Sequence, residues 1–138
     1  MNGINSWQRA IPRSWAVRPL RSVAGYAVSN VDKIPSDDEF PVRLCNYTDV
    51  YNNETINLDM DFMVGTATQA EIGKFRLLTD DVVITKDSET WEDIAIPALV
   101  TETADDFVCG YHLAMIRPDS EKLVGRVLRR CRQSARRT

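Results

Sequence analysis

Apolar residues occur along the chain mainly in short runs, which predict strands rather than long helices. Residues 82–85 (VVIT) are β-branched throughout, which is typical of a buried strand, and residues 94–100 form a second extended run. Residues 107–116 are apolar at both alternating positions, as expected for a central strand. Residues 42–45 are also β-prone, whereas the pattern over residues 55–64 fits either a strand or a helix.

Helical spacing is confined to three segments. Residues 15–24 place their apolar side chains about as one face of a short helix would. Thr68 and Glu71 stand three positions apart, which fits a capping box and predicts a short helix over residues 69–73. The third segment is the C-terminus, where the apolar positions are Leu123, Val124, Val127, Leu128 and Cys131.

This C-terminal segment gives the clearest helical pattern of the chain, and either Asp119 or Ser120 could cap its first turn. Together the patterns predict an α+β fold: a twisted mixed or antiparallel sheet with short flanking helices and a C-terminal amphipathic helix. We expect residues 1–14 to form a flexible N-terminal arm, residues 15–118 one domain, and residues 119–138 the helix.

Charge is distributed unevenly along the 138 residues. Residues 121–138 carry seven bases and one acid, a local charge of +6, so residues 1–120 carry −9 of the total charge of −3. Phosphate contacts normally supply most of the affinity of a nucleic-acid-binding protein. An acidic domain of this kind should bind DNA poorly by itself, unless its bases gather on one face or a partner supplies positive charge.

The composition disfavours several protein classes. The first twenty residues contain no continuous apolar core of the kind found in signal peptides. The longest apolar run, residues 94–100, is far too short to span a bilayer. The three cysteines are scattered and odd in number, which argues against a disulfide framework or a zinc knuckle. We therefore expect a cytoplasmic protein that has no membrane partner.

Candidate catalytic residues are few. The single histidine, His112, stands in an apolar run, and we expect it to be a packed or hydrogen-bonded core residue. Asp80, Asp81 and Lys86 flank one strand as in some metal-dependent nucleases. That arrangement also needs an acid two positions before the lysine to hold the metal, but Ile84 stands there. The simpler interpretation is that the aspartates are turn residues, which bond their own backbone. We expect no catalytic residue, metal or cofactor, and a carboxylate metal-dependent enzyme is the least favoured alternative.

Two polar segments, NYTDVYNN (46–53) and TKDSET (85–90), follow probable strands. Asn side chains can pair with adenine in the major groove and Lys with guanine, while Ser and Thr suit either base. Binding loops commonly stand beside rigid strands in this way. Asn, Asp and Ser also dominate loops simply because they form turns, so composition alone leaves recognition and turn formation evenly balanced.

Five stretches taken together, in order and spacing, resemble a known family. PVRLCNYTDVYNN, DFMVGTATQAEI, FRLLTDDVVITKDSET, IAIPALV and GYHLAMIRP are similar to the first target-recognition domain of type I restriction–modification specificity subunits. The resemblance runs from about Trp15 to the C-terminus. It implies that residues 15–118 are a target-recognition domain and that residues 119–138 begin a connecting helix.

In that family each recognition domain reads one half of a split DNA target, and methyltransferase (modification) subunits grip the connecting helices. The specificity subunit itself catalyses nothing. The resemblance thus implies double-stranded DNA and the methyltransferase subunits as partners, and the endonuclease subunit through them. Because the modification subunits close around the DNA, they would also compensate for the acidic domain. The partner-binding residues of the helix would be Leu123, Val127 and Cys131.

The resemblance covers one recognition domain and a helix of at most about 27 Å, at 1.5 Å per residue. Three alternatives remain: a relic or fragment that folds but does not assemble, two copies that pair as a homodimer to mimic a full subunit, or a truncated fragment that binds modification subunits without reading DNA. We expect the first for the isolated chain. The DNA-binding candidates are Tyr47, Thr48, Tyr51, Asn52 and Asn53 in one segment, Lys86, Ser88 and Thr90 in the other, and Lys74 and Arg76 for phosphate contacts.

Overall fold

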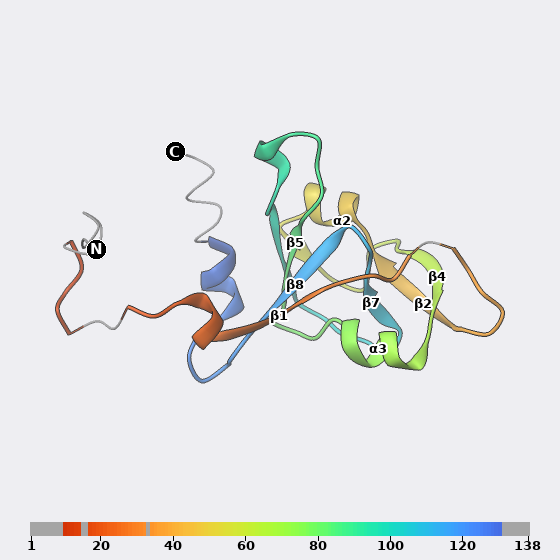
Figure 1. The fold of residues 1–138 in the computed structure, drawn as a ribbon, viewed down its shortest axis with the longest axis horizontal. Coiled ribbons are helices and arrows are strands. Elements are labelled where there is room, and N and C mark those ends of the chain that lie inside the picture. Colours follow the sequence, from red (N-terminus) through yellow and green to blue (C-terminus); the bar gives the residue numbers. More distant parts are fainter. Residues whose placement is uncertain (1–9, 15–16, 33, 131–138) are drawn as a thin grey trace.

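The computed structural model of the chain describes residues 10–14, 17–32 and 34–130. Within these ranges, eight strands form two mixed sheets with short helices around them (Figure 1). The predicted α+β class is confirmed, although the strands form two sheets rather than one. In the described part of the chain, no helix is both long and apolar enough to cross a membrane.

The larger sheet has five strands in the order β1-β8-β5-β6-β3. Its neighbours are antiparallel apart from the parallel pair β3 and β6. The predicted strand at residues 82–85 is confirmed as β5, at the centre of this sheet. The strands are β1 (Ala24–Val28), β3 (Thr55–Ile56), β5 (Val82–Thr85), β6 (Pro97–Val100) and β8 (Leu113–Pro118).

The smaller sheet has the order β4-β2-β7, with β2 (Phe40–Cys45) in the middle. β4 (Met63–Ala67) lies antiparallel to β2, and β7 (Phe107–Cys109) lies parallel to it. Buried side chains from both sheets form one hydrophobic core, which includes Leu44 of β2 and Leu113 of β8, both with no exposed surface.

The single strand predicted over residues 107–116 is wrong, because the chain turns sharply at Gly110 between β7 and β8. The Gly110 N–H donates to the carbonyl oxygen of Cys45 at 2.9 Å. A Cβ atom at position 110 would lie 2.6 Å from that oxygen, so only glycine allows the close approach. The turn passes the chain from one sheet to the other.

The helix predicted over residues 69–73 is confirmed as α3 (Gln69–Phe75). Its capping box is complete: the Glu71 N–H donates to the Thr68 hydroxyl oxygen at 3.1 Å, and the Thr68 N–H donates to a Glu71 carboxylate oxygen at 2.9 Å. Both signals were local, which is why the sequence alone located this helix.

The helix predicted over residues 15–24 is wrong. Its described part contains a single 3₁₀ turn, η1 (Leu20–Ser22), followed directly by β1. Val17 and Leu20 are exposed, so no apolar helix face packs there, and pairing with β8 fixes the chain as an edge strand. Residues 1–9 of the expected N-terminal arm lie outside the described residues.

The C-terminal helix begins later than predicted. Residues 119–123 form a turn in which the N–H groups of Lys122 and Leu123 both donate to the Asp119 carbonyl oxygen, at 2.8 Å. Residues 125–130 are helical, and residues 131–138 lie outside the described part. Neither Asp119 nor Ser120 caps the helix; instead the carboxylate of Asp80 accepts from the Gly125 N–H.

Candidate nucleic-acid interface

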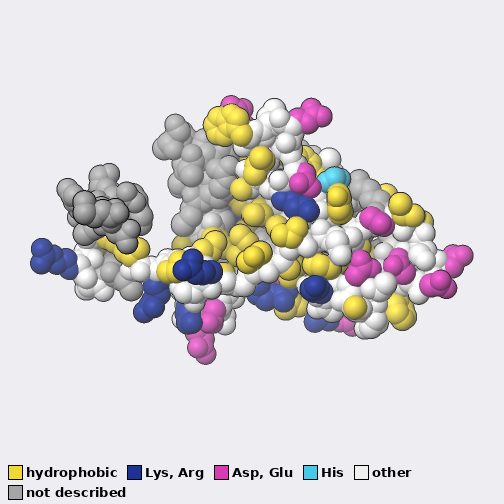
Figure 2. All heavy atoms as spheres, in the orientation of Figure 1, with side chains coloured by type: hydrophobic (Ala, Val, Ile, Leu, Met, Phe, Trp, Pro, Cys, Tyr) yellow, Lys and Arg dark blue, Asp and Glu magenta, His cyan; other side chains and the backbone are white. Residues whose placement is uncertain are grey.

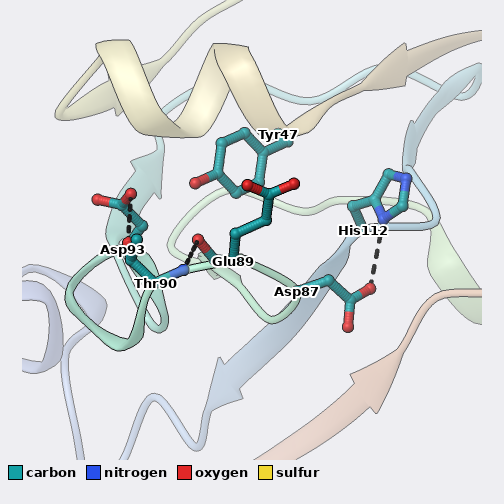
Figure 3. Close-up of a pocket in the computed structure, with 7 residues that line it drawn as sticks. Tyr47, Asp87, Glu89, Thr90, Asp93 and His112 are labelled. Atoms are coloured by element: carbon teal, nitrogen blue, oxygen red, sulfur yellow. Dashed lines mark hydrogen bonds and ion pairs between the residues drawn. The ribbon is translucent and has the colours of Figure 1, made fainter.

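An open cleft of about 700 Å³ lies between helix α2 (Tyr47–Asn52) and the loop of residues 86–93 (Figure 3). Tyr47, Ser88 and Thr90, three of the residues predicted to contact DNA, line this cleft together. The two polar segments thus meet although they are about forty positions apart in the sequence. The remaining lining residues are Asp87, Glu89, Asp93 and His112.

The segment that contributes Tyr47 was predicted to be a loop, and this is wrong: it is a helix of six residues. A capping box of Asn46 and Asp49 starts it, with the Asn46 N–H donating to Asp49 at 2.8 Å. Burial raises the pKa of the Asp49 carboxyl, partly opposed by that backbone hydrogen bond. Tyr47 stacks on Tyr51 with ring centroids 5.7 Å apart, so the helix presents Tyr47 to the cleft in a fixed orientation.

The loop on the other side of the cleft is held by the buried hydroxyl of Thr85. This hydroxyl donates to the Asp93 carbonyl oxygen at 2.5 Å and accepts from the Ile96 N–H at 2.9 Å. Within the loop, the Thr90 hydroxyl donates to the Asp93 carboxylate at 2.9 Å, and the Thr90 N–H donates to the Ser88 hydroxyl at 3.3 Å. The short 3₁₀ turn η2 (Trp91–Asp93) completes the loop.

His112 and Lys86 share one carboxylate beside the cleft. The Nδ1 atom of His112 lies 3.3 Å from Asp87, and the Lys86 ammonium lies 3.8 Å from the same oxygen and 4.9 Å from the centroid of the Tyr111 ring. The side chain of His112 is 47% exposed, so it is hydrogen-bonded as expected but is not in the core. Lys86 does not line the cleft and is already paired at its edge.

The other predicted DNA-binding residues of the first segment do not reach the same cleft. Tyr51, Asn52 and Asn53 line a smaller depression of about 210 Å³, together with Glu54. The Asn53 amide also donates to the Asp49 carbonyl oxygen at 2.9 Å. Thr48 is exposed and lines neither depression.

Lys74 and Arg76, predicted to contact phosphate, lie at the end of α3 rather than beside the cleft. In Figure 1, α3 lies on the side of the domain opposite to α2. Arg76 is paired with Asp105 at 3.2 Å, and Lys74 lies 5.8 Å from the centroid of the Phe75 ring. A DNA duplex bound at the cleft would therefore have to extend around the domain to touch them.

The cleft is acidic, because Asp87, Glu89 and Asp93 all line it beside a single histidine. Such a surface repels phosphate, whereas a carboxylate can accept a hydrogen bond from the amino group of cytosine. Figure 2 shows acidic side chains over the top and right of the molecule, and basic ones along its lower left. On this face most of the described bases thus lie apart from the acids, although Lys86 lies at the edge of the cleft.

Sequence reasoning missed His112 and the three cleft carboxylates as members of the site. A signal was present: Gly110 interrupts the apolar run just before Tyr111 and His112, and glycine followed by polar residues marks a turn. The carboxylates were read only as loop formers, since nothing local to residues 86–93 indicates that α2 packs opposite them.

The aspartates of the nuclease alternative are engaged elsewhere. Both carboxylate oxygens of Asp80 accept from the Gly125 N–H. Asp81 is buried, accepts two hydrogen bonds from Arg117 at 2.9 Å and accepts one from the Leu78 N–H at 2.8 Å. The bond from Leu78 confirms that Asp81 bonds its own turn. Among the residues that the structure describes, no group of three or more His, Cys, Asp and Glu could hold a metal.

The partner-binding residues predicted on the C-terminal helix differ in exposure. Val127 is 52% exposed and the neighbouring Val124 is 53% exposed, whereas Leu123 is half-buried. Cys131 lies outside the described residues. Among the residues named here, the exposed apolar surface at the start of this helix is therefore formed by the two valines rather than by Leu123.

Neither a scan against protein-family models nor a search of curated proteins finds a match for this chain. The likeness to type I specificity subunits accordingly rests on the five stretches and their order. Any functional conclusion rests on the cleft and on the charge distribution.

Proposed function

We propose that this chain is a DNA-recognition module, which reads one half-site as part of a type I restriction–modification specificity subunit and catalyses no reaction itself. It would act in the cytoplasm, with methyltransferase subunits and, through them, the endonuclease subunit. One observation carries the proposal: Tyr47 of one polar segment and Ser88 and Thr90 of the other line a single open cleft.

The cleft offers hydrogen-bonding groups on well-supported elements. The Tyr47 ring and the hydroxyl groups of Ser88 and Thr90 could contact base edges or the sugar-phosphate backbone. Glu89, which also lines the cleft, is an acceptor suited to an amino group of cytosine. Side chains on α2 and on a loop tied down by Thr85 lose little freedom when they bind.

Affinity would come from a different part of the protein. Because the cleft repels phosphate, the isolated chain should bind DNA weakly. Bases of the C-terminal segment and the closing modification subunits would supply the attraction. Specificity and affinity would then be supplied by separate surfaces.

A second candidate is a truncated fragment that binds modification subunits without reading DNA. The observation that favours it is the combination of an acidic cleft with two exposed valines: Val124, just before the C-terminal helix, and Val127, within it. Deleting residues 121–138 would abolish association in this case, whereas changes in the cleft would have no effect.

The test is selection of duplexes from a random DNA library by the chain together with type I methyltransferase subunits. The expected result is a short preferred half-site. Tyr47→Ala should weaken binding to that site roughly 5- to 150-fold, which corresponds to about 1–3 kcal/mol. Tyr26→Ala is the matched control, because Tyr26 is a 77% exposed tyrosine outside the cleft.

Lys86→Ala tests the edge of the cleft in a gel-shift at low and moderate salt, and weaker specific binding is expected. A selected library with no sequence preference would contradict the proposal. Equal affinities of the Tyr47 and Tyr26 variants would show that this cleft is not the reading surface.

A further inference from the structure

The described part of the C-terminal helix meets the domain at a close contact between Gly125 and Asp80. The Gly125 N–H lies 3.1 and 3.0 Å from the two carboxylate oxygens of Asp80. A Cβ atom at position 125 would lie only 2.2 Å from the Asp80 carbonyl oxygen. The backbones of Gly125 and Asp80 are therefore in direct contact, and any residue other than glycine at position 125 would displace one of them.

Asp80 is itself a fixed point of the domain. Its N–H donates to the Val100 carbonyl oxygen at 2.9 Å, and the Val100 N–H donates to the Asp81 carbonyl oxygen at 2.9 Å. The next side chain, Asp81, is buried under Arg117. Asp80 has a φ of +78°, a conformation that Asp and Asn adopt more readily than most residues. The turn that contains Asp80 and Asp81 is thus held by hydrogen bonds to β6 and by the ion pair between Asp81 and Arg117.

Other attachments of the helix are weaker. Val124 and Val127 are more than half exposed, so apolar packing holds only part of its surface. One turn after Gly125, Arg129 lies 3.7 Å from Glu54, beyond hydrogen-bonding distance. The Nε and Nη1 atoms of Arg129 are buried and lack a hydrogen-bond partner within the described part of the chain. The contact at Asp80, at 3.0 and 3.1 Å, is shorter than the ion pair at Arg129 and is made to a turn that is itself hydrogen-bonded to β6.

We propose that Asp80 and Gly125 form a joint that fixes the direction in which the C-terminal helix leaves the domain. Asp80 is a positioning residue: its carboxylate holds the first helical N–H, and the absence of a side chain at Gly125 sets the distance of approach. The inference does not depend on DNA reading. The joint sets where the exposed Val124 and Val127 lie relative to the cleft.

The helix direction can be measured in the weakly aligned, ¹⁵N-labelled full-length chain from residual dipolar couplings of backbone N–H groups. In the natural sequence, couplings from residues 125–130 and from β5 and β6 should fit one alignment tensor. In Asp80→Gly, which keeps the positive φ and removes the carboxylate, the helix couplings should no longer fit the tensor of the sheet. Gly125→Ala should have the same effect from the other side of the contact.

Gly73→Ala is the matched control for the glycine change, because a Cβ at this position of α3 meets nothing within 4 Å. It should leave the helix couplings unchanged. Asp80→Asn keeps an oxygen acceptor and a residue type that tolerates the backbone conformation, so it should stay close to the natural sequence. Helix couplings that fit the sheet tensor equally well in Asp80→Gly and Gly125→Ala would overturn the joint. If either Asp80→Gly or Gly125→Ala fails to fold, the other variant is sufficient for the test.

Discussion

Replacing Arg117 by methionine should destabilise the fold substantially, because it leaves the buried carboxylate of Asp81 without its cationic partner. The guanidinium donates to both oxygens of Asp81 at 2.9 Å and to the Arg76 carbonyl oxygen at 3.0 Å. The hydrogen bond to Asp81 accordingly raises the pKa of Arg117. The Asp81 side chain is only 1% exposed. Methionine keeps most of the apolar length of arginine and removes these three hydrogen bonds.

The expected loss follows from the burial of the two partners. Breaking a buried ion pair from one side costs about 3–5 kcal/mol. The Arg117 side chain is 42% exposed, so water can reach the vacated position, and we expect the lower end, about 3 kcal/mol. A domain of this size has a free energy of unfolding of about 5–15 kcal/mol, so the variant should still fold.

Urea unfolding at pH 7 gives the measurement. The matched control is Arg43→Met: Arg43 forms a similar pair with Asp106 at 2.7 Å, but with side chains 33% and 46% exposed, and should cost no more than about 1 kcal/mol. Adding Asp81→Asn to Arg117→Met should recover part of the loss, since the uncompensated charge is gone while an acceptor for the Leu78 N–H remains. A loss for Arg117→Met no larger than that of the control, or strictly additive effects in the double variant, would refute the reasoning.

Three smaller predictions concern other parts of the fold. The hydrogen bond from Arg43 lowers the pKa of Asp106 in the folded state. The stabilisation that this ion pair gives is therefore present above the carboxyl pKa of the unfolded chain, about 4, and is lost as pH falls through the lower pKa of the folded state. When unfolding is measured at decreasing pH, the difference in the free energy of unfolding between wild type and Arg43→Met should shrink as pH falls below the unfolded carboxyl pKa. Burial raises the pKa of the thiols of Cys45 and Cys109, both fully buried, so a variant with the third cysteine replaced by serine should show no fast thiol in a colorimetric assay until urea is added. Thr68→Ala removes the cap of α3 and should lower the free energy of unfolding by about 1 kcal/mol, whereas Thr68→Ser should be nearly neutral.

The parts of the fold that the sequence located are those stabilised by local or uniform signals. β5 is β-branched throughout and buried on both faces except at Ile84, so its composition alone indicates a strand. α3 is bounded by a complete capping box within four residues of sequence. Neither element requires knowledge of what packs against it.

The elements that were missed depend on contacts from distant residues. α2 is a helix of six residues whose only buried side chain is Val50, so its stability comes from tertiary packing rather than from periodicity. Residues 55–64 contain parts of two strands: Thr55 and Ile56 pair as β3 with β6, more than forty positions away, and Met63 and Val64 begin β4, which pairs with β2. The turn at Gly110 likewise depends on the carbonyl oxygen of Cys45.

The candidate site was predictable in part, because its residue types are visible in the sequence but their grouping depends on strand order. β8 lies beside β5, and this places His112, just before β8, against the start of the 86–93 loop, where the Lys86 N–H donates to the His112 carbonyl oxygen at 3.3 Å. Sheet order alone thus brings His112 to the edge of the cleft, whereas the same order leaves Lys74 and Arg76 on α3 outside it.

The structure shows where part of the negative charge of the sequence lies. Part of the negative charge of residues 1–120 lies in the cleft as Asp87, Glu89 and Asp93, while the bases concentrate in residues 121–138. Under the proposed function, this separation requires the C-terminal segment and its partners to attract the DNA backbone before the cleft can examine base edges. The direction set at Gly125 would then also decide where the described bases of the helix, Arg126, Arg129 and Arg130, lie relative to the cleft.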